Sequence, residues 1–250
     1  MEIAEHVAHL DREGGLLADA ATAAGLDSSV PTCPGWQVRD LVQHLSGVHR
    51  WATAYVLTGN PNPTTEAEDA ELFAAVEDEQ LIPRFRHGHA ALVAALAAAP
   101  AGLACWTFLA APSPLAFWAR RQAHETAIHR VDADAAAGRT SSCAPALAAD
   151  GIDELLRGFL SRPRGRLVAD PPVSLGVRAT DTGDAWTIRI EPDRRVVASG
   201  AGDADCTVTG AASDLYLLLW NRRAADRTVG VAGDATVLDL WRERATIRWS

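Results

Sequence analysis

The chain has 250 residues, of which 48% are apolar and 22% charged, so its composition is that of a globular protein with one large domain or two small ones. Its net charge of −9 argues against nucleic acid or an acidic membrane surface as a partner. All 23 basic residues are arginine, which excludes Schiff-base chemistry and a phosphate-binding loop that depends on lysine.

The first residues include acidic side chains, and no segment approaches the roughly 20 apolar residues of a membrane span. We therefore expect neither a signal peptide nor a membrane helix. Four cysteines are scattered without the spacing of a zinc or redox motif: Cys33, Cys105, Cys143 and Cys206. Reduced thiols in a cytoplasmic protein are the simplest interpretation.

The first 140 residues have the pattern of long helices separated by polar breaks. We expect helices over 2–24 and 36–58, a third from the acidic stretch at 66 to about Pro100, and a fourth over 115–137. Pro83 is expected to kink or split the third helix. Four helices of this length predict an up-and-down four-helix bundle as the first domain, residues 1–140.

The pattern changes after the linker "GRTSSCAP", residues 138–145. A helix is expected over 145–161, followed by five short alternating runs and two final helices. The runs are "RLVA", "VSLGVRAT", "AWTIRIEP", "RRVVASG" and "DCTVTG", and the helices are "AASDLYLLLWNRR" and "DATVLDLWRERA". Residues 145–250 are therefore predicted to form a small α+β domain with an antiparallel sheet.

The segment "AHETAIHRVDAD", residues 123–134, combines histidines with carboxylates on the predicted fourth helix. His124 and His129 are five residues apart, which places them about 140° apart around the helix axis. Glu125 and His129 are four residues apart, within about 40° of each other. If a metal binds here, Glu125 and His129 form the pair and His124 faces away. The alternative is a solvated, charged helix face.

A third ligand is available from the second predicted helix, where His44 lies inside an apolar run. A polar side chain in such a run forms a hydrogen bond or binds a metal ion, because its burial otherwise costs free energy of folding. His44, Glu125 and His129 would form a two-histidine, one-carboxylate set, which suits catalytic zinc or non-haem iron; a hydrogen-bonded core histidine is the alternative for His44. Asp132 lies on the face of Glu125 and is expected either to orient a ligand or to pair with an arginine such as Arg130.

Other chemistries have little support. The sequence lacks GxSxG, a dinucleotide-binding GxGxxG and a Walker motif. Cys33 precedes Pro34, Gly35 and Trp36 at a predicted helix start, where the pKa of a thiol can fall, but a buried structural cysteine is the alternative.

Two stretches, "TCPGWQVRDLVQHLSGVHRW" and "RRQAHETAIHRVDAD", resemble the mycothiol-dependent maleylpyruvate isomerase family, whose N-terminal domain is a DinB-like four-helix bundle. The later stretches "DCTVTGAASDLYLLLWNRR" and "VAGDATVLDLWRE" are similar to the sterol-carrier-like α+β domain of the family. The resemblance implies a metal, usually zinc, at His44, Glu125 and His129. It also implies an arginine near the active site, for which Arg222 in Trp220-Asn221-Arg222 is the candidate, although the family has glycine before it.

The resemblance implies a zinc-dependent isomerase or thiol S-transferase that uses mycothiol as cosubstrate and acts on a small electrophilic acid such as maleylpyruvate. Two alternatives are a non-catalytic, regulatory protein that binds metal or ligand, and a metal-dependent hydrolase that needs no thiol. The expected partners are a small substrate and a low-molecular-weight thiol, with no nucleic acid and no membrane. The expected oligomeric state is a monomer or a homodimer.

Overall fold

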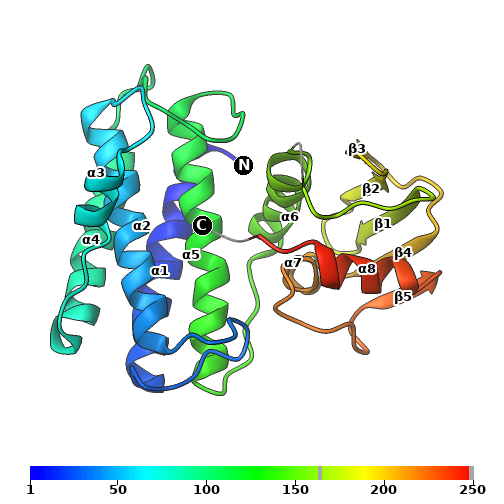
Figure 1. The fold of residues 1–250 in the computed structure, drawn as a ribbon, viewed down its shortest axis with the longest axis horizontal. Helices are drawn as coiled ribbons and strands as arrows, with labels where there is room; N and C mark the ends of the chain where they lie inside the picture. The colour runs from blue at the N-terminus through cyan, green and yellow to red at the C-terminus, as the bar shows by residue number, and fades with distance from the viewer. Residues whose placement is uncertain (163–164, 248–250) are drawn as a thin grey trace. The chain divides into compact units, whose positions relative to one another are not determined.

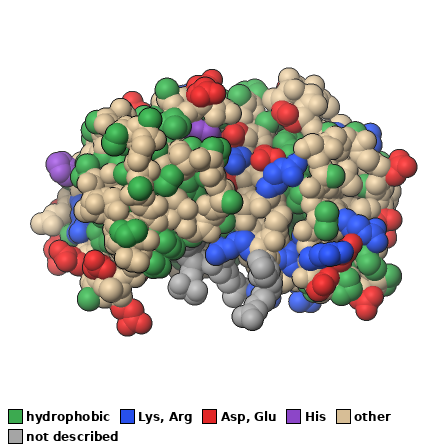
Figure 2. All heavy atoms as spheres, turned by 90° about the horizontal axis from the view of Figure 1, so that it is seen from above, with side chains coloured by type: hydrophobic (Ala, Val, Ile, Leu, Met, Phe, Trp, Pro, Cys, Tyr) green, Lys and Arg blue, Asp and Glu red, His purple; other side chains and the backbone are tan. Residues whose placement is uncertain are grey.

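The computed structural model describes residues 1–162 and 165–247. The chain divides into two compact units, Met1–Ser141 and Ser142–Ser250, and the division falls within the predicted linker. Figure 1 shows the elements of both units in order along the chain. None of the helices in the described ranges is long and apolar enough to cross a membrane. On the face seen in Figure 2, acidic side chains and arginines are interspersed over the exposed surface.

The first unit is a four-helix bundle with one short additional helix (Figure 1). Its helices are α1 (Ile3–Ala24), α2 (Val38–Thr58), α3 (Glu66–Leu72), α4 (Asp78–Ala98) and α5 (Pro114–Ala136). The long helices α1 and α2 each pack against both α4 and α5. The four-helix bundle predicted from the sequence is confirmed, but its up-and-down order is wrong: α1 and α2, and likewise α4 and α5, follow each other in the chain and lie diagonally in the bundle rather than side by side.

The ends of α2 and α5 follow from local sequence. Gly59 ends α2 in a left-handed conformation, with φ of 65°, that glycine adopts without steric cost. Ser113 caps α5 by accepting a hydrogen bond from the backbone N–H of Ala116 at 3.1 Å, and Pro114 occupies the first helical position. These signals fix where α2 ends and where α5 begins.

The predicted third helix is in fact two helices, and the break does not fall at Pro83. The chain leaves α3 at Leu72, while α4 continues through Pro83. Side chains of α2 satisfy carbonyls at the break: Arg50 donates to Leu72 at 2.7 Å and Gln43 donates to Phe73 at 2.9 Å. Because these partners are far away in the sequence, the local pattern could not reveal the break.

The second unit is an α+β unit, as predicted. Its described elements are α6 (Pro145–Asp153), the π-helix η1 (Glu154–Leu160), β1 (Val173–Ala179), β2 (Ala185–Ile190), β3 (Arg195–Ser199), β4 (Cys206–Gly210), α7 (Ala212–Leu219), β5 (Gly230–Gly233) and α8 (Thr236–Arg244). The five strands form one sheet in the order β3-β2-β1-β4-β5. Helices α7 and α8 both pack against β1.

The sheet is mixed rather than wholly antiparallel, because β4 pairs with β1 in parallel. The other pairs, β1–β2, β2–β3 and β4–β5, are antiparallel. The predicted strand at 166–169 is wrong: this segment is irregular, although its Leu167 is buried. The strand β5 was not predicted, because its four residues are all exposed and two of them are glycine.

Candidate metal centre

Glu125 and His129 are buried against other parts of the bundle, so the solvated-face alternative for "AHETAIHRVDAD" is wrong for these two residues. Every residue from 121 to 133 is buried. Ionisable side chains in such a setting need partners, because an isolated buried charge is costly. The partners of Glu125 and His129 come from α2, from α5 itself and from the loop before α2.

His44, Glu125 and His129 come together between α2 and α5. The Oε1 atom of Glu125 lies 3.2 Å from His44 Nε2 and 3.3 Å from His129 Nε2. The two imidazole rings meet edge to face, with centroids 5.2 Å apart. One ligand atom from each residue lies within 4.8 Å of the others, which is the arrangement needed to hold one metal ion. Two imidazole nitrogens and a carboxylate oxygen fit zinc, and also iron.

The two oxygens of Glu125 have different partners. Oε1 faces the two histidines, whereas Oε2 accepts from the guanidinium of Arg121 at 3.3 Å, one helical turn earlier. Burial by itself would raise the pKa of Glu125, but its hydrogen bonds with His129 and His44 and the charges of His129 and Arg121 hold that pKa well below its ordinary value. Glu125 is therefore an ionised carboxylate at neutral pH, which is the form that binds a metal.

His129 is held at both ring nitrogens. Nδ1 lies 2.8 Å from Oδ2 of Asp132, and Nε2 faces Glu125. Burial alone would lower the pKa of His129, but hydrogen bonds with Asp132 and Glu125, together with their charges, raise it to about 9. A proton on Nε2 takes the position that a metal would need, so proton and metal compete for this nitrogen.

The ring of Trp36 packs against both histidines, a contact that the sequence did not predict. Its ring stacks on His129 at a centroid distance of 6.2 Å and meets the edge of His44 at 5.3 Å. The only signal in the sequence is an aromatic residue directly before a helix that carries a candidate ligand. Trp36 gives the cluster an apolar wall on the side of the loop that precedes α2.

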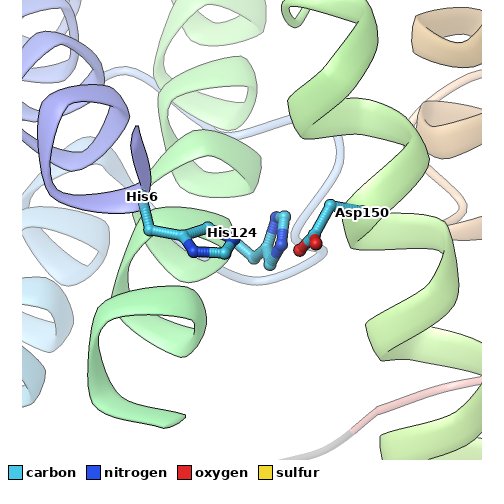
Figure 3. A group of neighbouring side chains, drawn as sticks. All are labelled: His6, His124 and Asp150. Atoms are coloured by element: carbon cyan, nitrogen blue, oxygen red, sulfur yellow. The ribbon is translucent and has the colours of Figure 1, made fainter. Parts of the chain in front are cut away.

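His124 lies on another face of α5, as the five-residue offset predicted. Figure 3 shows its ring beside that of His6 from α1, and the ring centroids are 5.9 Å apart. His124 is fully buried. It is not among the residues that surround Glu125 Oε1.

Another buried histidine, His49, lies one and a half turns after His44 on α2. Its Nε2 is 2.9 Å from the hydroxyl of Thr126, its ring packs against Phe85 and His89, and its Nδ1 has no hydrogen-bond partner in the described part of the chain. Burial is the main cause that lowers the pKa of His49 to about 3. The side chain is therefore a neutral core histidine.

We expect His49 to make the fold sensitive to acid. Because its pKa is about 3 in the folded state and near 6.5 in the unfolded state, its contribution to stability is present above pH 6.5 and is lost as the pH falls towards 3. The loss approaches about 1.4 kcal/mol per pH unit. Urea unfolding with a chelator present should show a loss between pH 7.5 and 5 that is about 2 kcal/mol larger for the wild type than for His49→Gln. Equal losses in the two proteins would contradict this assignment.

Arg222 belongs to the second unit, directly after α7. Its Nη1 donates to the carbonyl of Trp220 at 3.1 Å, and it lines a surface pocket with Asn221, Arg223 and Arg242. Asn221 has a φ of 57°, which turns the chain sharply at this point. The catalytic role of Arg222 stays a prediction.

The helical bundle that holds two histidines and a glutamate between two of its helices is of the DinB-like type, and an α+β unit follows it in the chain. The family model of the mycothiol maleylpyruvate isomerase N-terminal domain matches residues 7–134, and that of the MDMPI C-terminal domain matches residues 146–240. The chain belongs to the mycothiol maleylpyruvate isomerase family, which is an enzyme family. All three residues of the cluster lie inside the first match.

The fold agrees with solved structures. The mycothiol-dependent maleylpyruvate isomerase is 12% identical in sequence and gives a TM-score of 0.62, with 93% of each chain covered. A histidine-to-alanine mutant of that isomerase gives a TM-score of 0.63 at the same identity and coverage. A comparison with curated proteins found no matching sequence.

Proposed function

We propose that the protein is a zinc-dependent enzyme that uses mycothiol as its thiol cosubstrate, with His44, Glu125 and His129 as the metal ligands. The proposed reaction is isomerisation of, or thiol transfer to, a small electrophilic acid such as maleylpyruvate. The observation that supports it most is the meeting of His44 from α2 with Glu125 and His129 from α5 around one carboxylate oxygen, at 3.2 and 3.3 Å. This cluster lies in a chain of the mycothiol maleylpyruvate isomerase family.

The donor set suits the proposed metal. His44 and His129 would each offer Nε2, and Glu125 would offer Oε1, while Arg121 balances the charge of the second glutamate oxygen. Three protein ligands leave room for an exogenous ligand, which is the pattern of catalytic rather than structural zinc. A zinc ion held there would supply Lewis acidity and lower the pKa of a bound thiol.

The organic chemistry needs no nucleophile from the protein. The sulfur of mycothiol would add to the double bond of the substrate, and rotation about the resulting single bond followed by elimination would give the trans product and return the thiol. In a transferase the adduct would be released instead. Arg222 is the proposed partner of a substrate carboxylate, because a guanidinium can bind both carboxylate oxygens at once.

A cytoplasmic location is part of the proposal. No disulfide links the four cysteines in the described part of the chain, and two of them, Cys143 and Cys206, are buried. This arrangement suits a reducing compartment.

The test is an assay of the zinc-loaded protein with maleylpyruvate, and separately with generic electrophiles, each with and without mycothiol. We expect turnover only when both metal and mycothiol are present, and at least a hundredfold loss for His44→Ala, because an incomplete ligand set does not hold the metal. Lack of turnover with every substrate would remove the thiol-transfer proposal. Turnover without any thiol would instead favour a metal-dependent hydrolase.

A further inference from the structure

Asp132 is a fully buried carboxylate that receives hydrogen bonds from two parts of the bundle. Its Oδ2 lies 2.8 Å from His129 Nδ1, within α5, which is hydrogen-bond distance. Its Oδ1 accepts from the hydroxyl of Thr32 at 2.5 Å, and its Oδ2 also accepts from the thiol of Cys33 at 3.3 Å. Thr32 and Cys33 lie in the loop before α2, about a hundred positions away in the sequence.

These contacts bear on which of the two ring nitrogens of a neutral His129 carries the hydrogen. An ionised carboxylate only accepts hydrogen bonds, so the hydrogen between His129 and Asp132 is on Nδ1. In the neutral ring the lone pair is then on Nε2, the nitrogen that faces Glu125 at 3.3 Å. The tautomer that Asp132 selects is therefore the one that can complete a metal centre with His44 and Glu125.

We propose that Asp132 is a positioning residue that fixes the tautomer and orientation of His129, and that Thr32 and Cys33 hold Asp132 in place for this purpose. This inference rests on the proposed metal centre. It assigns Thr32 and Cys33 the task of supporting a ligand on another helix, and it gives neither of them a part in the chemistry itself.

The loop that carries Thr32 and Cys33 has a defined backbone. Ser29 and Gln37 form an isolated antiparallel bridge, and the N–H of Val30 donates to the carbonyl of Trp36 at 2.9 Å. The N–H of Trp36 donates in turn to the carbonyl of Cys33 at 3.0 Å. The same loop thus supports the edge of the His129 ring through Asp132 and one face of it through Trp36.

Arg130 was the alternative partner considered for Asp132. In the structure Arg130 donates to Glu13 at 2.6 Å and to Asp134 at 3.1 Å. Asp134 therefore offers a matched control for Asp132: it lies on the same helix and is hydrogen-bonded to Arg130 and Ser141.

Cys33, His129 and Asp132 could also hold a metal ion by themselves, since their ligand atoms lie within 4.8 Å of one another. That site would need the lone pair of His129 on Nδ1, which is the opposite tautomer. The two arrangements are thus distinguishable by which substitutions remove the metal.

The test measures the zinc affinity of purified full-length variants by competition with a chromogenic chelator. We expect Asp132→Asn to weaken zinc binding by about 10- to 100-fold, Asp134→Asn by less than about threefold, and Asp132→Glu to restore part of the loss. Cys33→Ser keeps a hydrogen-bond donor and is expected to stay near the wild type. In the zinc-loaded protein with ¹⁵N-labelled histidine, the Nδ1–H resonance of His129 should be seen in the wild type and be shifted or lost in Asp132→Asn.

Absence of stoichiometric zinc in the wild type would defeat the metal-centre proposal itself. Zinc binding by the wild type with equal affinity in Asp132→Asn would overturn only the positioning role. If Asp132→Asn does not fold, the double variant Thr32→Val/Cys33→Ala decides, because it keeps the carboxylate: affinity within twofold of the wild type would overturn the inference. Loss of zinc in Cys33→Ala with full occupancy in His44→Ala would place the metal at Nδ1 of His129, beside Cys33. This result would overturn the inference as well.

Discussion

Alanine in place of His44 or His129, or glutamine in place of Glu125, should leave the purified protein with less than about a tenth of the metal that the wild type carries. Each change removes one of the three proposed protein ligands, and a set of two would no longer hold zinc against a competing chelator. His124→Ala is the matched control, because it alters the same helix but lies against His6 rather than Glu125. Elemental analysis after dialysis against a weak chelator measures all four variants without any substrate.

Two results would contradict the ligand set. Full occupancy in the His44 variant would show that α2 contributes no ligand and that the site does not join two helices. Loss of metal in the His124 variant, with metal retained in the Glu125 variant, would show that the metal binds to another face of α5.

Glu13→Ala should cost about 3 kcal/mol of the free energy of unfolding, because it removes a partner from a buried cation. The Nε of Arg130 donates to Glu13 Oε2 at 2.6 Å between α5 and α1, and the two side chains are 5% and 1% exposed. Without Glu13, Arg130 stays buried and keeps Asp134 at 3.1 Å. Urea unfolding of the chelator-treated protein measures the loss.

The control for this ion pair is Asp19→Ala. Asp19 pairs with Arg86 at 2.7 Å, but the two side chains are 68% and 49% exposed, so the pair is screened by water and its loss should cost less than about 1 kcal/mol. Glu13→Gln keeps the shape of the side chain and one hydrogen-bond acceptor. Its loss in the free energy of unfolding should therefore lie between the losses of the two alanine variants. A loss below about 1 kcal/mol in Glu13→Ala would mean that the pair does not hold α1 to α5.

The sequence predicted the bundle well because its information is local. Apolar periodicity and glycine stops define α1 and α2, whereas a serine-proline start and Gly138 after its end define α5, in each case without reference to the rest of the chain. The same helical geometry separated Glu125 and His129 from His124, and the structure places them on those faces. The sequence could not show that the middle of α5 is buried, since a charged segment on a solvated helix face and one in the buried middle of a helix have similar patterns.

The features that were missed depend on residues far apart in the chain. The end of α3 is satisfied by Gln43 and Arg50 of α2, and no local signal marks it. The parallel pairing of β1 with β4 and the addition of β5 are decided by sheet assembly rather than by strand propensity. In the same way, the contact of Asp132 with Thr32 joins positions a hundred residues apart, so a spacing argument on one helix leaves its role open.

The most direct test of the proposed metal centre is an anomalous-scattering map from a crystal of the zinc-loaded protein, recorded at the zinc absorption edge. We expect one peak at about 2.0–2.2 Å from His44 Nε2, His129 Nε2 and a carboxylate oxygen of Glu125. The same map should show no peak beside the thiol of Cys33. A peak bonded to Cys33, Asp132 and His129 Nδ1, or one beside His6 and His124, would contradict the metal centre proposed for this protein.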